Sequence, residues 1–185
     1  MNNEEILELV KKYVKNENSI KHMLATEAIM RALADRFGED EKIWEISGLV
    51  HDIDMEIADY RINPEKHGLI GAEILEKSGF DEAIVNAVKA HNEKTGKARE
   101  TLLEKAIYCT DPLTGLIVAS VLVLPSKKLA DLTSESVLKR FREKSFAKGA
   151  RREAISACSE IGLTLDEFVS VGLSAMQGIS EQIGL

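Results

Sequence analysis

The segment Ile43-Trp44-Glu45-Ile46-Ser47-Gly48-Leu49-Val50-His51-Asp52 decides the fold class predicted for this chain. It is a mostly apolar run that closes on two adjacent polar residues, His51 and Asp52. The run fits a buried helix, and no alternating strand pattern of useful length appears here or elsewhere in the sequence. We therefore expect a helix over residues 40–51 with the His-Asp pair at its end.

Amphipathic helical stretches fill most of the remaining sequence. Glycines mark their expected ends and aspartates their expected starts, at Gly38, Gly79, Gly162, Asp40 and Asp81. The run Thr164-Leu165-Asp166-Glu167 has the form of a capping box. The sequence therefore predicts an all-α fold, one single-domain helical bundle over residues 1–185. The expected helices are 4–15, 19–37, 40–51, 65–77, 81–92, 100–124, 134–144, 150–160 and 164–182.

Composition and charge limit the classes of protein to consider. At 185 residues and 44% hydrophobic content, the chain can bury one substantial core. A net charge of −7 argues against a nucleic-acid polymer or a membrane as partner, because clustered Lys and Arg bind both. The longest apolar stretch, 116–124, is far shorter than the roughly 20 residues that span a bilayer, so it predicts a buried helix. No signal peptide is recognisable, and Cys109 and Cys158 suit reduced thiols of a cytoplasmic protein.

All four histidines belong to one series with two aspartates, namely His22, His51-Asp52, His67, His91 and Asp111. Apart from the His-Asp pair, each lies on an apolar stripe with steps of three and four residues, which is typical of the inward face of a helix. An unpaired carboxylate or a charged imidazole in such a position is costly. The series therefore needs a shared partner.

A divalent metal is the partner that these side chains suit. Imidazole nitrogen and carboxylate oxygen bind iron, manganese, cobalt, nickel, zinc or magnesium, and no cysteine in the series favours a thiolate site. A single histidine on an apolar stripe is more often a hydrogen-bonded core residue than a ligand. Here the whole histidine inventory lies on inward faces together with two aspartates, which favours a metal site over independent core histidines.

These residues resemble the motif of the HD-domain metal-dependent phosphohydrolases, in which a histidine, an adjacent His-Asp pair and a distant aspartate follow one another. The resemblance runs from about residue 19 to about residue 132 and includes His67 and His91, which mark two-metal members of the family. The run KHGLIGAEIL at 66–75 looks like the helix after the pair in HDIG-type proteins and in bacterial HD-family hydrolases of diadenosine tetraphosphate. The resemblance implies an HD-type core over about 19–132. The apolar helices expected over 133–185 complete the bundle or form a homodimer face.

Two departures from the family pattern concern the substrate. Asp54 stands where the HDIG motif has glycine, and Met55 stands where the cyclic-di-GMP phosphodiesterases often have lysine. The Gly-Tyr-Pro element of those enzymes is also missing. These departures argue against activity on cyclic-di-GMP and do not affect the metal site.

The resemblance implies two metal ions per chain, with iron or manganese favoured. His22, His51, Asp52 and Asp111 would hold the first, and Asp52 would bridge to a second held by His67 and His91. Two such cations produce a metal-activated hydroxide near neutral pH and neutralise charge on a phosphoryl oxygen. Asp52 and Asp54 are the expected catalytic carboxylates. Asp54 either holds a ligating histidine or orients the water, or it is a surface or capping residue.

Basic residues are candidates for binding substrate phosphates. Arg61 and Lys66 flank the loop between Asp52 and His67, and they either contact phosphates or are solvated. A second basic cluster reads more readily as a solvated helix face than as a phosphate-binding rim or a partner contact. It contains Lys139, Arg140, Arg142, Lys144, Lys148, Arg151 and Arg152.

One proline bears on the extent of the helix that carries Asp111. Pro112 directly follows Asp111 and predicts a kink or a break in that helix, or marks its boundary.

The predicted function is metal-dependent hydrolysis of a small nucleotide or a related phosphate ester or anhydride. The resemblance suggests dinucleoside polyphosphate cleavage as its sharper form. The partner is therefore a small phosphorylated substrate, with no nucleic-acid polymer and no membrane. The alternative is a non-catalytic HD-type module that senses a nucleotide or binds a protein. The complete set of six ligand-type residues favours the enzyme, because family members that have lost catalysis commonly lose ligands.

Overall fold

The computed structural model describes residues 1–185 as ten α-helices and three short 3-10 helices, without a strand. The all-α prediction is confirmed. The α-helices are α1 (Asn3–Tyr13), α2 (Glu17–Phe37), α3 (Glu41–Val50), α4 (Leu69–Lys77), α5 (Glu82–His91), α6 (Leu102–Leu122), α7 (Ser134–Arg142), α8 (Arg152–Ser156), α9 (Leu165–Gly178) and α10 (Ser180–Ile183). The 3-10 helices are η1 (Glu93–Thr95), η2 (Leu129–Asp131) and η3 (Ala157–Ile161).

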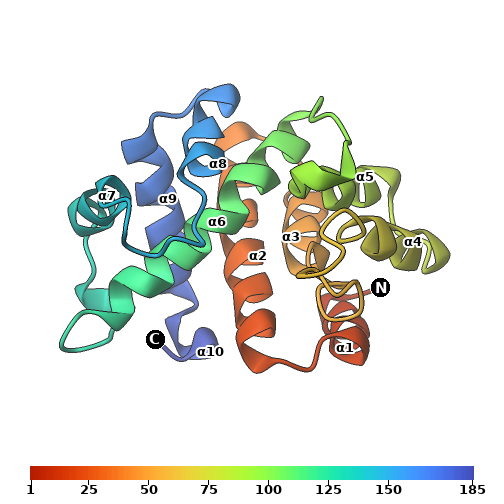
Figure 1. Cartoon of the computed structure of the whole chain (residues 1–185), viewed down its shortest axis with the longest axis horizontal. Helices are drawn as coiled ribbons and strands as arrows, with labels where there is room; N and C mark the ends of the chain where they lie inside the picture. The colour runs from red at the N-terminus through yellow and green to blue at the C-terminus, as the bar shows by residue number, and fades with distance from the viewer.

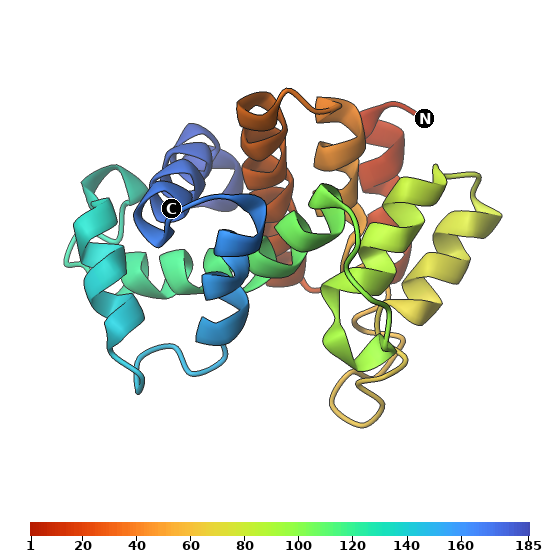
Figure 2. The same ribbon diagram turned by 90° about the horizontal axis from the view of Figure 1, so that it is seen from above.

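The long helices α2 and α6 lie between two groups of shorter helices. Figure 1 shows α6 crossing the molecule diagonally, with α7, α8 and α9 on one side and α3, α4 and α5 on the other. Figure 2, turned by 90°, separates the same two groups. The C-terminus lies beside α10 on the first side, and the N-terminus lies beside α1 on the second.

Two apolar clusters follow this division. The larger joins α2 and α6 to the helices after residue 132, with fully buried side chains such as Leu113 and Phe168. The smaller joins α1, α3, α4 and α5 around residues such as Val10 and Leu75. The C-terminal helices thus complete the core, which is one of the two roles expected for them.

A glycine sets the distance between α2 and α3. A Cβ atom on Gly48 would lie 2.7 Å from both Cα and N of Glu27, so any larger residue would push the two helices apart. The helices therefore meet backbone to backbone. This contact brings His51, three residues after Gly48, next to His22 on α2.

The predicted helix caps are confirmed. Asp40 and Asp81 accept hydrogen bonds from the first amides of α3 and α5. Thr164 and Glu167 form the capping box of α9. Gly38 ends α2 in the left-handed conformation, with a φ of 69°, which glycine adopts at little cost.

Several predicted boundaries were wrong. The helix expected over 65–77 begins at Leu69, because Gly68 has a φ of 87° and cannot belong to a helix. The helix expected over 150–160 divides into α8 and the tighter η3, and the one expected over 164–182 is interrupted at Ile179.

Pro112 neither bounds nor breaks α6, which continues to Leu122 with this proline buried inside it. By length and composition α6 could cross a membrane, but 67% of its most apolar window is buried within the protein, as in a core helix.

Candidate metal centre

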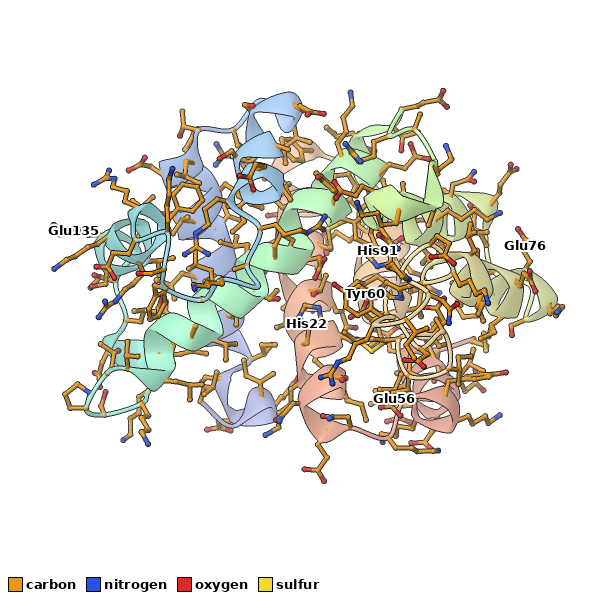
Figure 3. The ribbon with its side chains drawn as sticks, in the orientation of Figure 1. His22, Glu56, Tyr60, Glu76, His91 and Glu135 are labelled. Carbon is orange, nitrogen blue, oxygen red and sulfur yellow. The ribbon has the colours of Figure 1, made fainter.

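Six histidine and aspartate side chains from five segments meet where α2, α3, α5 and α6 approach one another. His22 projects from α2, His51 and Asp52 follow α3, His67 precedes α4, His91 is the last residue of α5, and Asp111 lies on α6. Figure 3 shows His22 and His91 near the middle of the molecule, with Tyr60 beside them and Glu76 and Glu135 at opposite edges. The predicted convergence of these side chains is what the structure shows.

The first ligand group consists of His22, His51, Asp52 and Asp111. The Nε2 atoms of His22 and His51 are 3.1 Å apart. Nε2 of His22 also lies 3.2 Å from Oδ1 of Asp111 and 3.5 Å from Oδ2 of Asp52. Ligands of one cation lie about 3 to 3.5 Å from one another, because each is about 2.1 Å from the ion. These separations fit that value, whereas Nε2 of His51 and Oδ1 of Asp111 are 4.0 Å apart.

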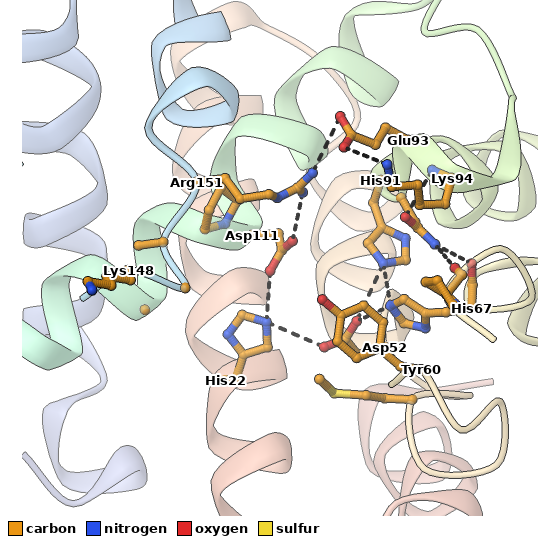
Figure 4. Close-up of a pocket in the computed structure, with 17 residues that line it drawn as sticks. His22, Asp52, Tyr60, His67, His91, Glu93, Lys94, Asp111, Lys148 and Arg151 are labelled. Atoms are coloured by element: carbon orange, nitrogen blue, oxygen red, sulfur yellow. Dashed lines mark hydrogen bonds and ion pairs between the residues drawn. The ribbon is translucent and has the colours of Figure 1, made fainter. Parts of the chain in front are cut away.

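The second ligand group consists of Asp52, His67 and His91. The Nε2 atoms of His67 and His91 are 3.0 Å apart. Oδ1 of Asp52 lies 3.1 Å from Nε2 of His67 and 3.4 Å from Nε2 of His91. Asp52 therefore belongs to both groups, in agreement with the bridging role that the family resemblance implied. Figure 4 shows Asp52 between His22 on one side and the two histidines on the other.

All four histidines turn the same nitrogen toward the centre. Nδ1 of His51 donates to the carbonyl of Gly48, and Nδ1 of His91 donates to that of Val88. Nδ1 of His67 donates to Oδ1 of Asp54 at 2.8 Å.

His22 completes this pattern through a hydroxyl group. Its Nδ1 lies 2.8 Å from Oγ1 of Thr114. The Thr114 hydroxyl donates its only hydrogen to the carbonyl oxygen of Asp111, so it accepts a hydrogen bond from Nδ1 of His22.

These hydrogen bonds show that the site fits metal ions. A neutral imidazole that donates from Nδ1 carries only a lone pair on Nε2. The four Nε2 lone pairs therefore face each other in two pairs, 3.1 and 3.0 Å apart, and no hydrogen bond can form between them. A divalent cation in each ligand group would satisfy all four, and the outer hydrogen bonds orient them as in known metal sites.

In the metal-free cluster, protons on the histidines supply part of the positive charge that cations would bring. Burial works against a charge on His67, but hydrogen bonds to Asp52 and Asp54 outweigh it and raise its pKa to about 10. At His51 burial prevails over the attraction of Asp52 and lowers the pKa to about 4. Burial would raise the pKa of Asp52, yet the charges of the surrounding histidines hold it well below its usual range. The site thus strongly favours bound positive charge.

A pocket of about 580 Å³ opens onto the centre. His22 and Asp111 are the ligands nearest to solvent, with 24% and 25% of their side chains exposed, whereas His51 is fully buried. The lining contains no serine, threonine or cysteine side chain. The pocket is large enough for a small ligand to reach the ligand groups from one side.

Asp54 holds a ligand, as one of the alternatives predicted. It is fully buried, so it is not a surface residue. One oxygen accepts from His67, and the other accepts from the backbone N–H groups of Gly68 and Gly71 at 2.8 and 2.7 Å. The carboxylate therefore also caps the start of α4, where Gly68 has no side chain to do so. Because both oxygens are engaged and Asp54 does not line the pocket, it positions His67 and does not orient water.

The expectation for Arg61 and Lys66 is not supported by this geometry. Both side chains are exposed, and neither lines the pocket, because the turns of residues 51–68 carry them away from the ligand groups. Cations from elsewhere take their place at the rim, namely Lys94, Lys148 and Arg151. Lys148 and Arg151 belong to the basic cluster for which the sequence favoured a solvated helix face. For Arg151 that interpretation was wrong, because its guanidinium group forms an ion pair with Asp111 in the pocket.

The sequence did not predict two residues that support the candidate ligands, Thr114 and Asn92. Thr114, three residues after Asp111, gave no signal because a buried threonine in a helix is ordinary. Asn92 donates to the carbonyls of Pro64 and His67 and so fixes the chain around His67. Its position directly after His91 was the only available hint.

Comparison with known proteins agrees with this site. The HD domain family model matches residues 19–116, just over half of the chain. One relative is the Bacillus subtilis protein named "Bis(5'-nucleosyl)-tetraphosphatase, symmetrical", to which the chain is 31% identical over 132 residues. That alignment covers 60% of this chain and 68% of the relative. Ribonuclease Y of Lawsonia intracellularis is 33% identical over 99 residues, 54% of this chain and 18% of that enzyme. The chain thus spans about a fifth of the length of the ribonuclease Y relatives it matches.

A solved structure shares the fold. The HD domain of the L. monocytogenes phosphodiesterase PgpH superposes with a TM-score of 0.57 at 14% identity, over 99% of this chain and 100% of that one. A complex of the same domain with cyclic-di-AMP gives the same TM-score. At this identity the likeness concerns the helical fold alone, and it confirms the predicted HD-type bundle.

Proposed function

The chain belongs to the HD domain family, and from this premise we propose that it is a metal-dependent phosphohydrolase of small nucleotides or related phosphate esters and anhydrides. The observation that carries the proposal is the pair of ligand groups that share Asp52. Each group pairs two inward-facing imidazole lone pairs with a carboxylate beside an open pocket. That is the donor set of a site for two cations.

The chain's own residues define the rest of the reaction. Bound divalent cations at these two positions would lower the pKa of a water molecule toward neutrality and neutralise charge on a phosphoryl oxygen. The pocket lining offers no hydroxyl or thiol of Ser, Thr or Cys as a nucleophile, so water is the attacking group. Asp54 and Thr114 hold His67 and His22 in the orientation that ligation needs. The pocket admits the substrate from the side of His22 and Asp111.

The finer proposal concerns the substrate and the metal. We favour a dinucleoside polyphosphate, since the Bacillus subtilis relative is named for such a compound and is matched over most of its length. The net charge of −7 makes an RNA polymer the less suitable substrate, although the ribonuclease Y relatives make it the necessary comparison. Iron or manganese is the proposed metal, with two ions per chain.

A metal analysis followed by a substrate screen tests the proposal. The purified chain should bind two equivalents of manganese or iron and release phosphate or nucleotide from mononucleotides, cyclic nucleotides or dinucleoside polyphosphates. Asp52→Ala should lack both metal and turnover, which excludes a contaminating enzyme.

Two other results would redirect the interpretation. Cleavage of an RNA oligonucleotide with no turnover of small nucleotides would replace the proposed substrate class. A metal-loaded chain that hydrolyses none of these compounds would be the non-catalytic nucleotide-sensing or protein-interaction module.

A further inference from the structure

Arg151 reaches the metal centre from outside the segment that matches the HD domain family. It lies between α7 and α8, beyond residue 116. Its Nη2 atom is 3.7 Å from Oδ2 of the ligand Asp111, and its Nη1 atom is 3.7 Å from Oε2 of Glu93. Figure 4 shows the guanidinium group next to Asp111, with dashed lines from it to Asp111 and to Glu93. The C-terminal part of the chain thus contributes a cation to the site.

The donors of Arg151 are not used by the protein. A guanidinium group has five N–H donors, and both ion pairs of Arg151 are longer than a hydrogen bond. The group instead rests near the ring of Tyr108, 5.2 Å from its centroid. Tyr108 is fixed in turn by Arg99 over its ring and by a hydrogen bond from its hydroxyl to Glu93. Arg151 is therefore positioned without its hydrogen-bonding capacity being spent.

The neighbouring Arg152 shows the opposite use of the same side chain. It donates to six backbone carbonyls at 2.7 to 3.5 Å, those of Arg140, Phe141, Glu143, Phe146, Ala147 and Ala150. These bonds tie the loop 143–151 to the end of α7. Arg151 is consequently presented from a held loop, and little conformational entropy is lost when it binds a ligand.

The position of Arg151 indicates which ligand group it meets. A phosphate held at the two ligand groups would have its charge neutralised there, whereas the next phosphate along a chain would face Asp111 and Glu93, both anionic. Arg151 lies between these two carboxylates, and it is the only Lys or Arg side chain that forms an ion pair with a ligand carboxylate. A guanidinium fork binds phosphate oxygens in pairs and so could offset that repulsion.

We propose that Arg151 is a specificity-determining residue that binds the phosphate group next to the one held at the metal ligands. It thereby selects nucleotides with two or more phosphate groups over those with one. This inference rests on the proposed function and assigns the selectivity of its site to a residue outside the HD domain match.

Binding of two nucleotides that differ by one phosphate tests the inference. Equilibrium dialysis of the manganese-loaded full chain with AMP and with α,β-methylene-ADP, each checked by chromatography to remain intact, compares the two affinities. The wild type should bind the diphosphate at least about tenfold more tightly than AMP. Arg151→Gln should lower the diphosphate affinity about 10- to 100-fold, the range for a hydrogen bond to a charged group, and so remove the preference.

Arg142→Gln is the matched control. Arg142 carries the same charge on the neighbouring α7, is exposed and does not line the pocket, so its loss should leave both affinities as in the wild type. Bound manganese is measured in every variant and should not change.

Four results would overturn the inference. They are a wild type without preference, a variant that retains the preference, equal losses for Arg151→Gln and Arg142→Gln, and loss of bound manganese in Arg151→Gln. Because no hydrolysis is measured, an Arg151-dependent preference in a chain without turnover would sustain the inference while the proposed function failed.

Discussion

The two ligand groups of the metal centre are supported in different ways. In the second group the side chains of Asp52, His67 and His91 are 5%, 6% and 2% exposed, and the buried carboxylate of Asp54 anchors His67. In the first group His22 and Asp111 are about a quarter exposed, and a hydroxyl group alone supports His22. The second group is thus built into the fold, while the first forms the side from which a ligand enters. Each prediction below tests that difference.

The largest effect is expected from the residue that both groups share. Asp52→Ala removes a carboxylate from each group and should abolish binding of both metal ions and all turnover. Metal content by plasma emission spectrometry and nucleotide hydrolysis measure this. Retention of one full metal equivalent by the variant would show that Asp52 does not bridge the groups.

Single histidine replacements should separate the groups. His67→Ala leaves only Asp52 and His91 in the second group, so one metal equivalent should be lost even at saturating manganese. His22→Ala keeps both carboxylates of the first group, Asp52 and Asp111, beside His51, so its metal should bind more weakly but still load at saturation. Titration of both variants with manganese, followed by metal analysis, distinguishes the two outcomes. Identical titrations would contradict the proposed asymmetry.

Replacing Asp54, which supports the second group, should weaken metal binding more than replacing Thr114, which supports the first. Asp54→Asn supplies one oxygen where the site needs two acceptors, so either His67 or the start of α4 loses its partner. We expect a loss of about 10- to 100-fold in metal affinity at the second group, as found for partners of ligating histidines.

Thr114→Val should cost less than Asp54→Asn. Water can reach the partly exposed His22 and replace the lost hydroxyl acceptor, so we expect a loss of about tenfold or less. A larger effect of Thr114→Val than of Asp54→Asn would reverse the assignment of the built-in and open sides.

The smallest effect concerns the metal-free protein and its pH dependence. The pKa of His67 is raised to about 10, so its stabilising contribution is complete below the unfolded value of about 6.5 and is lost as pH rises toward 10. The pKa of His51 is lowered to about 4, so between about 4 and 6.5 the unfolded state binds more protons, and the protein loses stability as pH is lowered from 6.5 to 4. The contributions of His67 and His51 taken together are therefore greatest near pH 6.5, and thermal unfolding after chelation, followed as a function of pH, measures them.

Two variants test which groups cause the loss of stability at alkaline pH and which cause the loss at acid pH. His67→Ala should weaken the loss of stability at alkaline pH, which His67 shares with His22, whose pKa is also raised. His51→Ala should weaken the loss at acid pH, which His51 shares with Asp52 and Asp111. Metal-loaded protein should not show the His67-dependent loss of stability at alkaline pH, because ligation keeps His67 neutral. A loss of stability at alkaline pH that is as large in His67→Ala as in the wild type would assign it to other groups.

The sequence predicted that the six candidate ligands lie together, because each is a titratable residue in an apolar setting, where an unpaired charge is costly. It did not predict Thr114, which is neutral and common in helices. Arg151 could not be distinguished from Arg152 either, because only the packing of loop 143–151 decides which guanidinium turns to the carbonyls. Helix starts followed from local caps such as Asp40. The start of α4 did not, because its cap, Asp54, lies fourteen residues before Gly68.

The position of Asp54 also bears on how this chain can change in evolution. One oxygen of its carboxylate serves the metal site and the other serves the first turn of α4. A mutation there alters folding and metal binding together, so selection on either property constrains the other. A descendant that lost the second ligand group would still need an acceptor for the amides of Gly68 and Gly71. Asp54 should therefore persist in lineages that have lost His67 or His91, as a remnant of a site no longer in use.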